Sequence, residues 1–487
     1  MSCTTILVGK KASNDGSTMI ARNDDGYFDV KKLIVNEAKK GPFVYESKIG
    51  HLKIEIAEDR MRYTSSPSVD DAHGLWEAMG INEANVAMTA TETITSNSRV
   101  LAADPMVRFQ KGKDGKEDIP GGIGEEDLVT LVLPYIHSAK EGVLRLGALL
   151  EKYGTYEANG IAFSDHDEIW WLETIGGHHW ISKKVRDDQY VIMPNQFGLD
   201  NFDFSDAFGE QRENLCSSDL KEFVEANHLN LQNDGGSFNP RLSFGSRTDA
   251  DHVYNTPRAW FMGRYFNNLS IKWDGPDAQY NPESDNIPWA LVPDRKITID
   301  DVKYILSSYF QGTKYNPYQK ADYPEKGIYR PIGISRTGLM AVLQLRNDVP
   351  EELSAIEWIC FGSNAFNGII PVFTNVNKMP AYLSDVTLDV STNNFYWNSR
   401  LIGALVDPYF GKSIMHVERY QAALINKGRN IIQKFDKDMI SRGDYSLTEK
   451  ANEEVAKMAD EETKAVLAKV LLVASEGMKN SYSRSDN

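Results

Sequence analysis

The sequence predicts an α+β protein in which short antiparallel strands form two sheets and long helices follow them. Short apolar runs separated by turn residues recur as far as residue 374, without the regular strand–helix alternation of a parallel sheet. From about residue 393 the apolar residues recur at helical spacing instead, and the last predicted helix covers 447–479. The motif Ser446-Leu447-Thr448-Glu449 at its beginning is similar to a capping box.

A β-hairpin is predicted at the beginning of the chain. Residues 3–9 and 18–23 have the composition of strands, and Asn14-Asp15-Gly16 is typical of the turn between them. The second strand folds back beside the first, so the residues that follow it return to the level of residue 3. Further short strands are predicted at 32–36, 52–57 and 85–91.

The middle of the chain is predicted to contain a long loop, helices and a second group of strands. Residues 104–122 are polar and Gly-rich, which is typical of a surface loop. Apolar spacing predicts helices at 125–138, 140–153, 218–227 and 257–266. Strands are predicted at 159–164, 168–173, 178–183, 189–194, 338–346, 355–361 and 369–374. Only short turns separate the first four of these, which predicts an antiparallel meander.

The composition excludes several classes of partner. The 487-residue chain has a net charge of −16 and no basic segment of useful length, so its surface would repel nucleic acid. No apolar stretch suits a membrane span or a signal peptide. The cysteines Cys3, Cys216 and Cys360 are too few and too scattered for a disulfide framework. We therefore predict a cytoplasmic protein that binds neither nucleic acid nor membrane.

Cys3 is the main candidate for a catalytic residue. Taken alone, a cysteine at the start of a strand is most simply a small buried residue. Removal of Met1 and Ser2, however, would make Cys3 the N-terminal residue and place its thiol beside its own α-amine. A free α-amine titrates near ~8 and a free thiol near ~8.5, so the amine can accept the thiol proton without help from a histidine.

Two charged residues of the hairpin complete this arrangement. A nearby cation favours the thiolate, and a carboxylate can orient the amine. Arg22 and Asp25 lie at the end of the second predicted strand, where the hairpin brings them close to Cys3. Without that cysteine, the run Arg22-Asn23-Asp24-Asp25 would most simply be a solvated loop.

These residues resemble the cysteine branch of the N-terminal-nucleophile hydrolases, which includes bile salt hydrolases and penicillin V acylases. A narrower resemblance is to the dipeptidase A family of lactic acid bacteria. It is based on the first 25 residues, Gly80-Ile81-Asn82-Glu83, Glu141-Gly142-Val143 and 159–180. The last stretch is the most specific, because its run Leu-Glu-Thr-x-x-Gly-His-His-Trp is long and unusual in composition.

The resemblance implies a four-layer αββα sandwich, in which two antiparallel sheets are covered by helices. It further implies a catalytic domain over 1–410, a helical extension over 411–487 packed on that domain, and a homo-oligomer. Among the site residues, Asn195 would help to form the oxyanion hole, where one side-chain amide contributes ~3–4 kcal/mol. Arg258, at the start of a helix, would support the site electrostatically.

The same resemblance places substrate-binding residues at Asn82, Thr91 and Glu92. Bile salt hydrolases have an asparagine near the last two positions, where this chain has Ala90-Thr91-Glu92. A dipeptide carries an ammonium group that a bile salt does not have. We therefore expect Glu92 to face that ammonium.

Maturation is expected to need an additional step in this chain. Many members of the family begin Met-Cys, so that removal of the initiator exposes the nucleophile, but here Ser2 must leave as well. We expect the Cys3 thiol to attack the Ser2 carbonyl, and water to complete the cleavage.

No metal or other cofactor is predicted. His178 and His179 are adjacent, and neighbouring residues of a strand point to opposite faces, so the two would not easily bind one ion. The nine histidines contain no His-Glu-x-x-His or His-x-His pattern. Cys216 and Cys360 have no neighbours in the sequence that would activate them, and we expect both to be buried.

The sequence thus predicts a cysteine dipeptidase in which Cys3 attacks the amide bond of dipeptides. One alternative is an amide hydrolase of the same chemistry that acts on bile salts, penicillin V or acylated amino acids. A second is an interaction protein similar to the secernins, with little turnover. A third is a purely structural protein, in which the grouping of Cys3, Arg22, Asp25 and Asn195 would be a coincidence.

Overall fold

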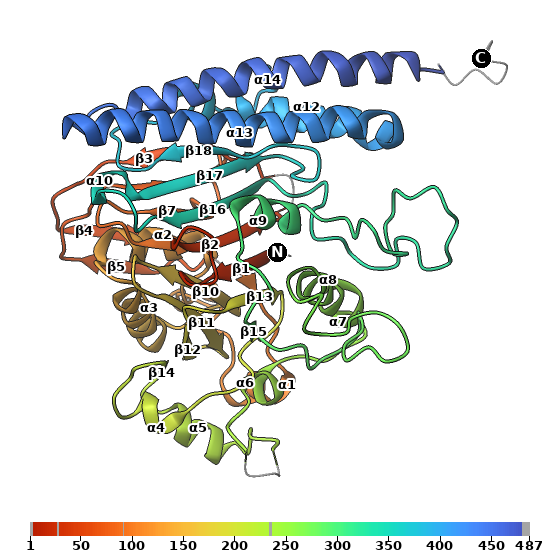
Figure 1. Cartoon of the computed structure of the whole chain (residues 1–487). Coiled ribbons are helices and arrows are strands. Elements are labelled where there is room, and N and C mark those ends of the chain that lie inside the picture. The colour runs from red at the N-terminus through yellow and green to blue at the C-terminus, as the bar shows by residue number, and fades with distance from the viewer. Residues whose placement is uncertain (1–2, 27–28, 91, 233–235, 480–487) are drawn as a thin grey trace.

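The computed structural model describes residues 3–26, 29–90, 92–232 and 236–479. Two sheets lie face to face in it, with β2 of one against β8 and β10 of the other, and helices cover their outer faces (Figure 1). The pairings between the named strands are all antiparallel in the described part of the chain. The predicted α+β class is confirmed.

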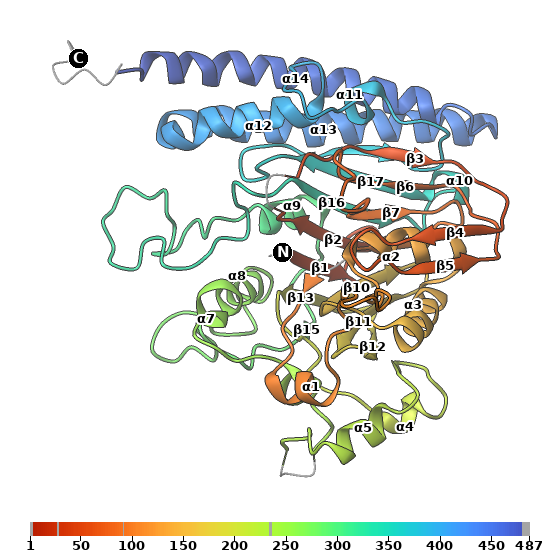
Figure 2. The same ribbon diagram turned by 180° about the vertical axis from the view of Figure 1, so that it is seen from behind.

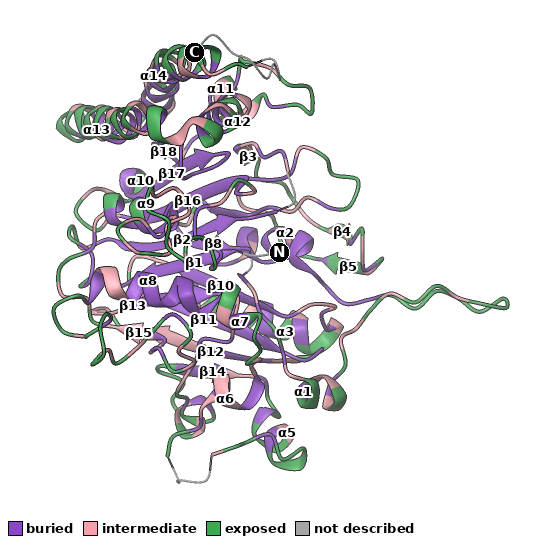
Figure 3. Cartoon of the chain, turned by 90° about the vertical axis from the view of Figure 1, so that its right-hand side faces the viewer, coloured by how far each residue is buried: buried purple, intermediate pink, exposed green. Residues whose placement is uncertain are grey.

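The first sheet has the strand order β15-β13-β1-β2-β16-β17-β18. Its strands, in chain order, are β1 (Thr4–Val8), β2 (Thr18–Asp24), β13 (Tyr190–Pro194), β15 (Ala290–Leu291), β16 (Leu339–Leu345), β17 (Ala355–Phe361) and β18 (Ile370–Phe373). Every residue of β1 and β2 is buried, because the second sheet covers one face and helices cover the other. Figure 3 shows this buried centre.

The second sheet has the order β14-β12-β11-β10-β8-β7, and β9 also pairs with β10. Its strands are β7 (Met79–Ile81), β8 (Ala87–Thr89), β9 (Glu92–Thr93), β10 (Asn159–Ser164), β11 (Ile169–Ile175), β12 (His179–Val185) and β14 (Asn214–Cys216). Two small sheets lie apart from these, and they pair β3 (Ile34–Asn36) with β6 (Tyr63–Ser65) and β4 (Phe43–Glu46) with β5 (Lys53–Ile56).

The predicted hairpin is confirmed, but the predicted four-strand meander is only partly correct. β10, β11 and β12 form a meander, whereas β13 crosses to the first sheet and pairs with β1, with Pro194 opposite Thr4. A short turn between two apolar strands has the same composition whether the next strand stays in the sheet or leaves it. The crossing brings the residue after β13 to the same end of the sheet as Cys3.

Helices cover the outer face of each sheet, which confirms the αββα order of layers. On the second sheet, α3 (Ala139–Tyr153) packs on β10, β11 and β12, with α2 (Glu125–Val132) beside it. On the first sheet, α9 (Ile299–Leu306) packs on β1, β2 and β16, and α8 (Thr256–Phe266) packs on β13. The shorter helices are α1 (Ser98–Ala103), α4 (Phe204–Ala207), α5 (Leu220–Ala226), α6 (Pro240–Phe244), α7 (Asp251–Tyr254), α10 (Glu351–Ser354) and α11 (Ala381–Ser384).

The predicted long C-terminal helices are present as α12 (Phe395–Val406), α13 (Phe410–Arg442) and α14 (Thr448–Glu476). α13 and α14 lie side by side, and both pack on β18 (Figures 1 and 2). The predicted capping box is wrong, because α14 begins without a side-chain cap and Glu449 accepts a hydrogen bond from the backbone of Asn377 instead. The division into 1–410 and 411–487 stays a prediction.

Two further findings concern the surface and the length of the helices. Residues 104–122 form a loop, as predicted, and most of the residues near its tip are exposed. Among the described residues, we find no helix that combines the length and the apolar character needed to span a membrane.

Candidate active site

The strand register gathers the predicted catalytic residues around Cys3, which precedes β1 and is completely buried. Thr4 lies opposite Asn23 of β2 on one side and opposite Pro194 of β13 on the other. The chain ends of β2 and β13 therefore flank Cys3. This register explains why Asp25 and Asn195, 170 positions apart in the chain, belong to one site.

Arg22 binds the sulfur of Cys3 directly. Its Nη2 donates a hydrogen bond to Cys3 Sγ over 2.9 Å, so the predicted proximity of these residues is observed. The guanidinium is fully buried and also pairs with Glu125 at 3.2 Å and with Asp24 at 3.6 Å. Glu125 is the first residue of α2, so the second sheet's helix layer helps to hold this cation in place.

The thiol of Cys3 has a strongly raised pKa. Burial raises it to about 12, which outweighs the lowering effect of the Arg22 charge, and Glu92, Asp24 and Glu125 raise it further. The thiol therefore keeps its proton at neutral pH in this state. A base within reach of the sulfur would make it a better nucleophile.

Asp25 is completely buried at the end of β2. Its Oδ1 accepts a hydrogen bond from Thr337 Oγ1 at 2.6 Å, and its Oδ2 forms an ion pair with Arg330. Arg330 was not predicted from the sequence. It is one of two arginines in the long segment between α9 and β16, and nothing in the sequence indicates that it points inward.

Arg258 joins Cys3 to Asn195. Its Nη1 donates to the carbonyl oxygen of Cys3 and to Thr4 Oγ1, and its Nη2 donates to Asn195 Oδ1 at 2.7 Å. Arg258 lies in the first turn of α8, as predicted, but it is fully buried. Burial, and then the charge of Arg330, lowers its pKa to about 9.

Asn195 is held by neighbours on two elements, α8 and β9. Beside the contact with Arg258, its Nδ2 donates to the carbonyl of Thr93 at 2.8 Å, and its backbone N–H donates to Glu92 Oε1 at 2.9 Å. These bonds fix the amide next to Cys3, in the region where the resemblance places the oxyanion hole.

Glu92 lies in β9 with 1% of its surface exposed. Its Oε2 accepts a hydrogen bond from Thr5 Oγ1 at 2.8 Å, so this carboxyl links β1 to the loop that contains Asn195. Burial raises its pKa to about 7, although the charges of Arg258 and Arg22 act in the opposite direction. The other residue predicted at this position, Thr91, lies outside the described residues.

Asn82 has a structural role that the sequence did not reveal. Its Nδ2 donates to the carbonyls of Leu133 and Ile136, and its Oδ1 accepts from the backbone of Ala84 and Val86. Both of its donor hydrogens and both of its acceptor positions are thus used by backbone groups. This amide has no donor left for a substrate, and we do not propose it as a substrate-binding residue.

His178 and His179 both bind one carboxylate. Their Nδ1 atoms lie 2.9 and 2.7 Å from the two oxygens of Asp104, an arrangement that ties the base of the 104–122 loop to the β11–β12 turn. Cys360 is buried and Cys216 is partly buried, and burial raises the pKa of each thiol, to about 11 and about 12. In the described part of the chain, no group of three or more His, Cys, Asp or Glu residues could hold a metal ion.

The geometry therefore brings Cys3 together with Arg22 on its sulfur, and with Arg258 and Asn195 on its carbonyl side. Glu125, Thr337 and Arg330 support this set, and none of the three was predicted from the sequence. A single sequence does not distinguish a buried carboxylate such as Glu125 from the many exposed ones. The arrangement suits attack by a thiol on a carbonyl carbon, with positive charge and an amide close to the oxyanion that forms.

Comparison with known proteins gives consistent matches. The model described as peptidase family C69 matches residues 2–423. A "Dipeptidase" of Bifidobacterium longum is 52% identical over 467 residues, which cover 95% of this chain and 87% of that protein. A "Probable dipeptidase A" of Streptococcus pyogenes is 47% identical over the whole of both chains. "Dipeptidase A" of Lactobacillus helveticus is 43% identical over 92% of this chain and 93% of that one.

Among solved structures, penicillin V acylase from Agrobacterium tumefaciens aligns with a TM-score of 0.36 and 15% identity. The alignment covers 82% of this chain and 96% of that one. So low a score carries no argument about this protein.

Proposed function

Since the chain belongs to peptidase family C69, we propose that it is a dipeptidase whose nucleophile is the thiol of Cys3. The observation that carries the proposal is the 2.9 Å hydrogen bond from Arg22 to Cys3 Sγ at a fully buried position. Relatives named as dipeptidases match the chain along nearly its whole length, which supports the substrate class. The resemblance of the sequence to the dipeptidase A family agrees with this membership.

Activation begins with the loss of Met1 and Ser2. After removal of the initiator, the sulfur of Cys3 adds to the carbonyl carbon of Ser2, and the Ser2–Cys3 peptide bond breaks as its nitrogen takes up the thiol proton. Water then hydrolyses the resulting thioester, which releases serine and restores the thiol. The product has a free α-amine on the same residue as the sulfur, and this amine can take the thiol proton.

The catalytic cycle uses the same two atoms. The α-amine of Cys3 takes the proton of the thiol as the sulfur attacks the dipeptide carbonyl, and it gives the proton to the amino acid that leaves. Asn195 and backbone amides hold the oxyanion, and the Arg22 guanidinium stabilises negative charge on the sulfur. Water then enters and releases the acyl group as the second amino acid.

Glu92 is proposed to face the ammonium group of the dipeptide. Its carboxyl accepts two hydrogen bonds within the protein, from Thr5 and from the Asn195 backbone. Two carboxylate oxygens can accept about four hydrogen bonds in total, so an ammonium can still be bound. A cationic neighbour would also favour the ionised form of a group whose pKa is about 7.

The experiment that tests the function compares Cys3→Ala with Cys216→Ala, a control that removes a cysteine far from the site. Hydrolysis is measured on a dipeptide panel, tripeptides, glycocholate and penicillin V. We expect Cys3→Ala to lose more than about 10⁴-fold in kcat, as removal of a nucleophile does in other hydrolases, and Cys216→Ala to keep full activity. Activity of Cys3→Ala on dipeptides would refute the proposal.

The same panel tests the alternatives. Faster turnover of glycocholate or penicillin V than of any dipeptide would favour the amide hydrolases of other substrates. Absence of turnover and of acylation at Cys3 would favour an interaction protein. Unchanged dipeptide affinity in Glu92→Gln would contradict the ammonium contact. The cytoplasmic location and the homo-oligomer stay predictions, and light scattering of the purified protein tests the second.

A further inference from the structure

Asp25 is a completely buried carboxylate at the end of β2, and its charge acts on Arg258, which binds the carbonyl of Cys3. Thr337 donates to one oxygen, and the guanidinium of Arg330 pairs with the other, with only 7% of the Arg330 side chain exposed. An arginine–carboxylate pair at this depth is held in one geometry and is little screened by solvent. Arg330 therefore acts on Asp25 both by position and by charge.

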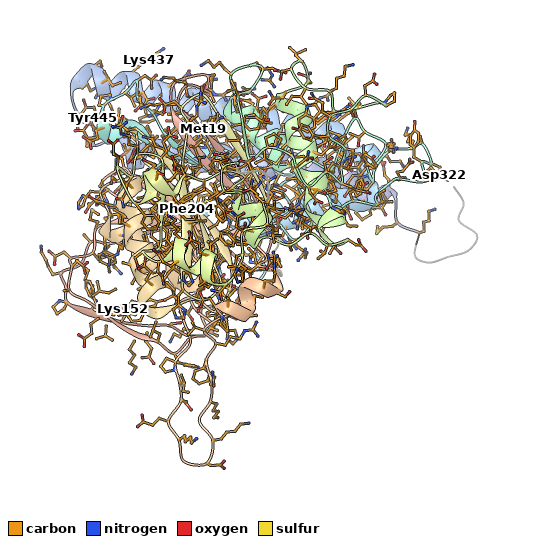
Figure 4. The ribbon with its side chains drawn as sticks, turned by 90° about the horizontal axis from the view of Figure 1, so that it is seen from below. Met19, Lys152, Phe204, Asp322, Lys437 and Tyr445 are labelled. Atoms are coloured by element: carbon orange, nitrogen blue, oxygen red, sulfur yellow. The ribbon has the colours of Figure 1, made fainter. Side chains whose placement is uncertain are left out.

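Arg330 is held in place by the segment that contains it. Its backbone N–H donates to the carbonyl of Val253 in α7, and the hydroxyl of Tyr329 donates to Glu283 at 2.8 Å. The ring of Tyr329 packs on Tyr315, which packs edge-to-face on Trp260 of α8. The outer part of this loop, around Asp322, extends away from the body of the molecule (Figure 4), but its inner end is fixed against α7 and α8.

The charge of Arg330 also acts on Arg258, on the other side of the site. It is the second cause, after burial, of the lowered pKa of Arg258, whose guanidinium binds the Cys3 carbonyl. The other charged groups that act on Cys3 are Arg22 and Asp24 from β2, Glu92 from β9, Glu125 from α2 and Arg258 from α8. Three carboxylates thus act on Cys3, and one of them, Asp24, is also paired with the buried Lys31 at 3.0 Å. Asp25 and Arg330 both act on Arg258.

We propose that Arg330 is a positioning residue, which orients the Asp25 carboxylate toward the Cys3 α-amine and offsets part of its negative charge. This rests on the proposed function, because it requires that the α-amine of Cys3 is the catalytic base. The base must be neutral to accept a proton. A carboxylate alone beside an amine favours the ammonium form, whereas a carboxylate paired with arginine does so much less.

The sign of the effect follows from this balance. Removal of the Arg330 charge leaves the negative charge of Asp25 without its positive partner. The ammonium form of the Cys3 amine then becomes more stable, and the amine loses its proton only at higher pH. The acidic limb of the kcat/KM profile reports the base of the free enzyme, so it moves to higher pH. A single charge at 4–6 Å shifts a pKa by about one unit or more, which corresponds to about a tenfold loss of kcat/KM below the limb.

The experiment measures kcat/KM for a dipeptide from pH 5 to 9 in the full-length protein. Arg330→Gln keeps a donor for Asp25 but removes the charge, Arg330→Met removes both, and Arg330→Lys keeps the charge. Lys326→Met is the matched control, because it removes an exposed positive charge from the same loop. We expect the limb to move up by about one unit in the Gln and Met variants, and to stay in place in the Lys variant and the control.

Two controls separate the outcomes. Mass spectrometry checks that each variant begins at Cys3, and thermal unfolding checks that it is folded. A processed, folded Arg330→Gln with an unmoved limb overturns the proposal. Loss of folding or processing in both uncharged variants, with both retained in Arg330→Lys, would make Arg330 a structural residue and would also overturn it. If Cys3→Ala keeps activity, the proposed function itself fails, whereas an inactive Cys3→Ala with an unmoved limb refutes only the role of Arg330.

Discussion

Charged side chains occupy opposite environments in the opening hairpin and in the two C-terminal helices. In β2, Arg22 and Asp24 are almost completely buried, and their partners are buried as well. Across α13 and α14, Lys434 pairs with Glu454 while 64% and 39% of their side chains remain exposed. Figure 3 shows the same contrast, with a buried centre and helices that expose one side.

The difference indicates what the two sets of charges do. Removal of a charge from water costs several kcal/mol, and an ion pair recovers this only when its geometry is good, so buried pairs add little net stability. The pairs on the helices keep their hydration and cost almost nothing. The hairpin therefore holds buried charges that cost free energy to remove from water, and we attribute them to catalysis. The helices, in contrast, supply apolar surface that packs on β18.

Among the charged residues compared here, the largest effect is expected for Arg22→Met. It removes the cation from Cys3 Sγ and leaves Glu125 without its guanidinium partner. We expect kcat/KM to fall by at least about a hundredfold and the unfolding free energy to fall by about 3–5 kcal/mol, because a charge is left buried and unpaired. Steady-state kinetics and urea unfolding measure the two effects. Arg264→Met, which removes a partly exposed arginine paired with Asp274, is the control, and an equal loss in both variants would contradict this account.

A pH-dependent effect is expected at Glu357, which is completely buried in β17 with a hydrogen bond from Thr64 at 3.2 Å. Burial raises its pKa to about 8, well above the value of about 4.5 in the unfolded chain. Its stabilising contribution is present below pH 4.5 and is lost as the pH rises through about 8. The amide of Glu357→Gln does not ionise. As the pH rises from 5 to 9, the unfolding free energy of the variant should therefore increase by about 2–4 kcal/mol relative to that of the parent.

Urea unfolding of the parent and of Glu357→Gln at several pH values measures this difference directly. Glu454→Gln on α14 is the matched control, since it replaces a carboxylate that is 39% exposed, and its stability should follow that of the parent throughout. If the two variants showed the same pH dependence, burial would not be the cause.

The smallest effect is expected on the helices. Lys434→Met removes the 2.9 Å ion pair with Glu454, and the unfolding free energy should change by less than about 1 kcal/mol, less still in high salt. Denaturant unfolding with and without added salt tests this. A loss larger than that of a buried pair would mean that the helices depend on their charges after all.

The sequence predicted the local part of the site well, because a hairpin links residues that are near in the chain. Thr5 lies opposite Arg22 in the hairpin, so the contact between Arg22 and the neighbouring Cys3 could be foreseen. Asn195 and Arg258 could be assigned only through resemblance. Asn195 lies near Cys3 because β13 crosses to pair with β1. Neither the hydrophobic periodicity nor the turn composition of the sequence indicates this crossing.

Burial of charge is the part that could not be predicted. Glu92 and Glu125 are buried carboxyls of the site, yet in composition they do not differ from the exposed glutamates of α14. Arg330 lies 305 positions from Asp25, and only the packing of its loop on α7 and α8 brings the two together. Asn82 shows the opposite error, because a residue in a family motif proved to be saturated by backbone hydrogen bonds.

The central claim is that the sulfur and the nitrogen of Cys3 act together, and intact-mass measurement of fully active protein tests it most directly. We expect a mass that corresponds to a chain beginning at Cys3, and a transient acyl group on that residue when a slowly hydrolysed dipeptide is added. Full activity in protein that still carries Ser2, with the nitrogen of Cys3 held in a peptide bond, would contradict it.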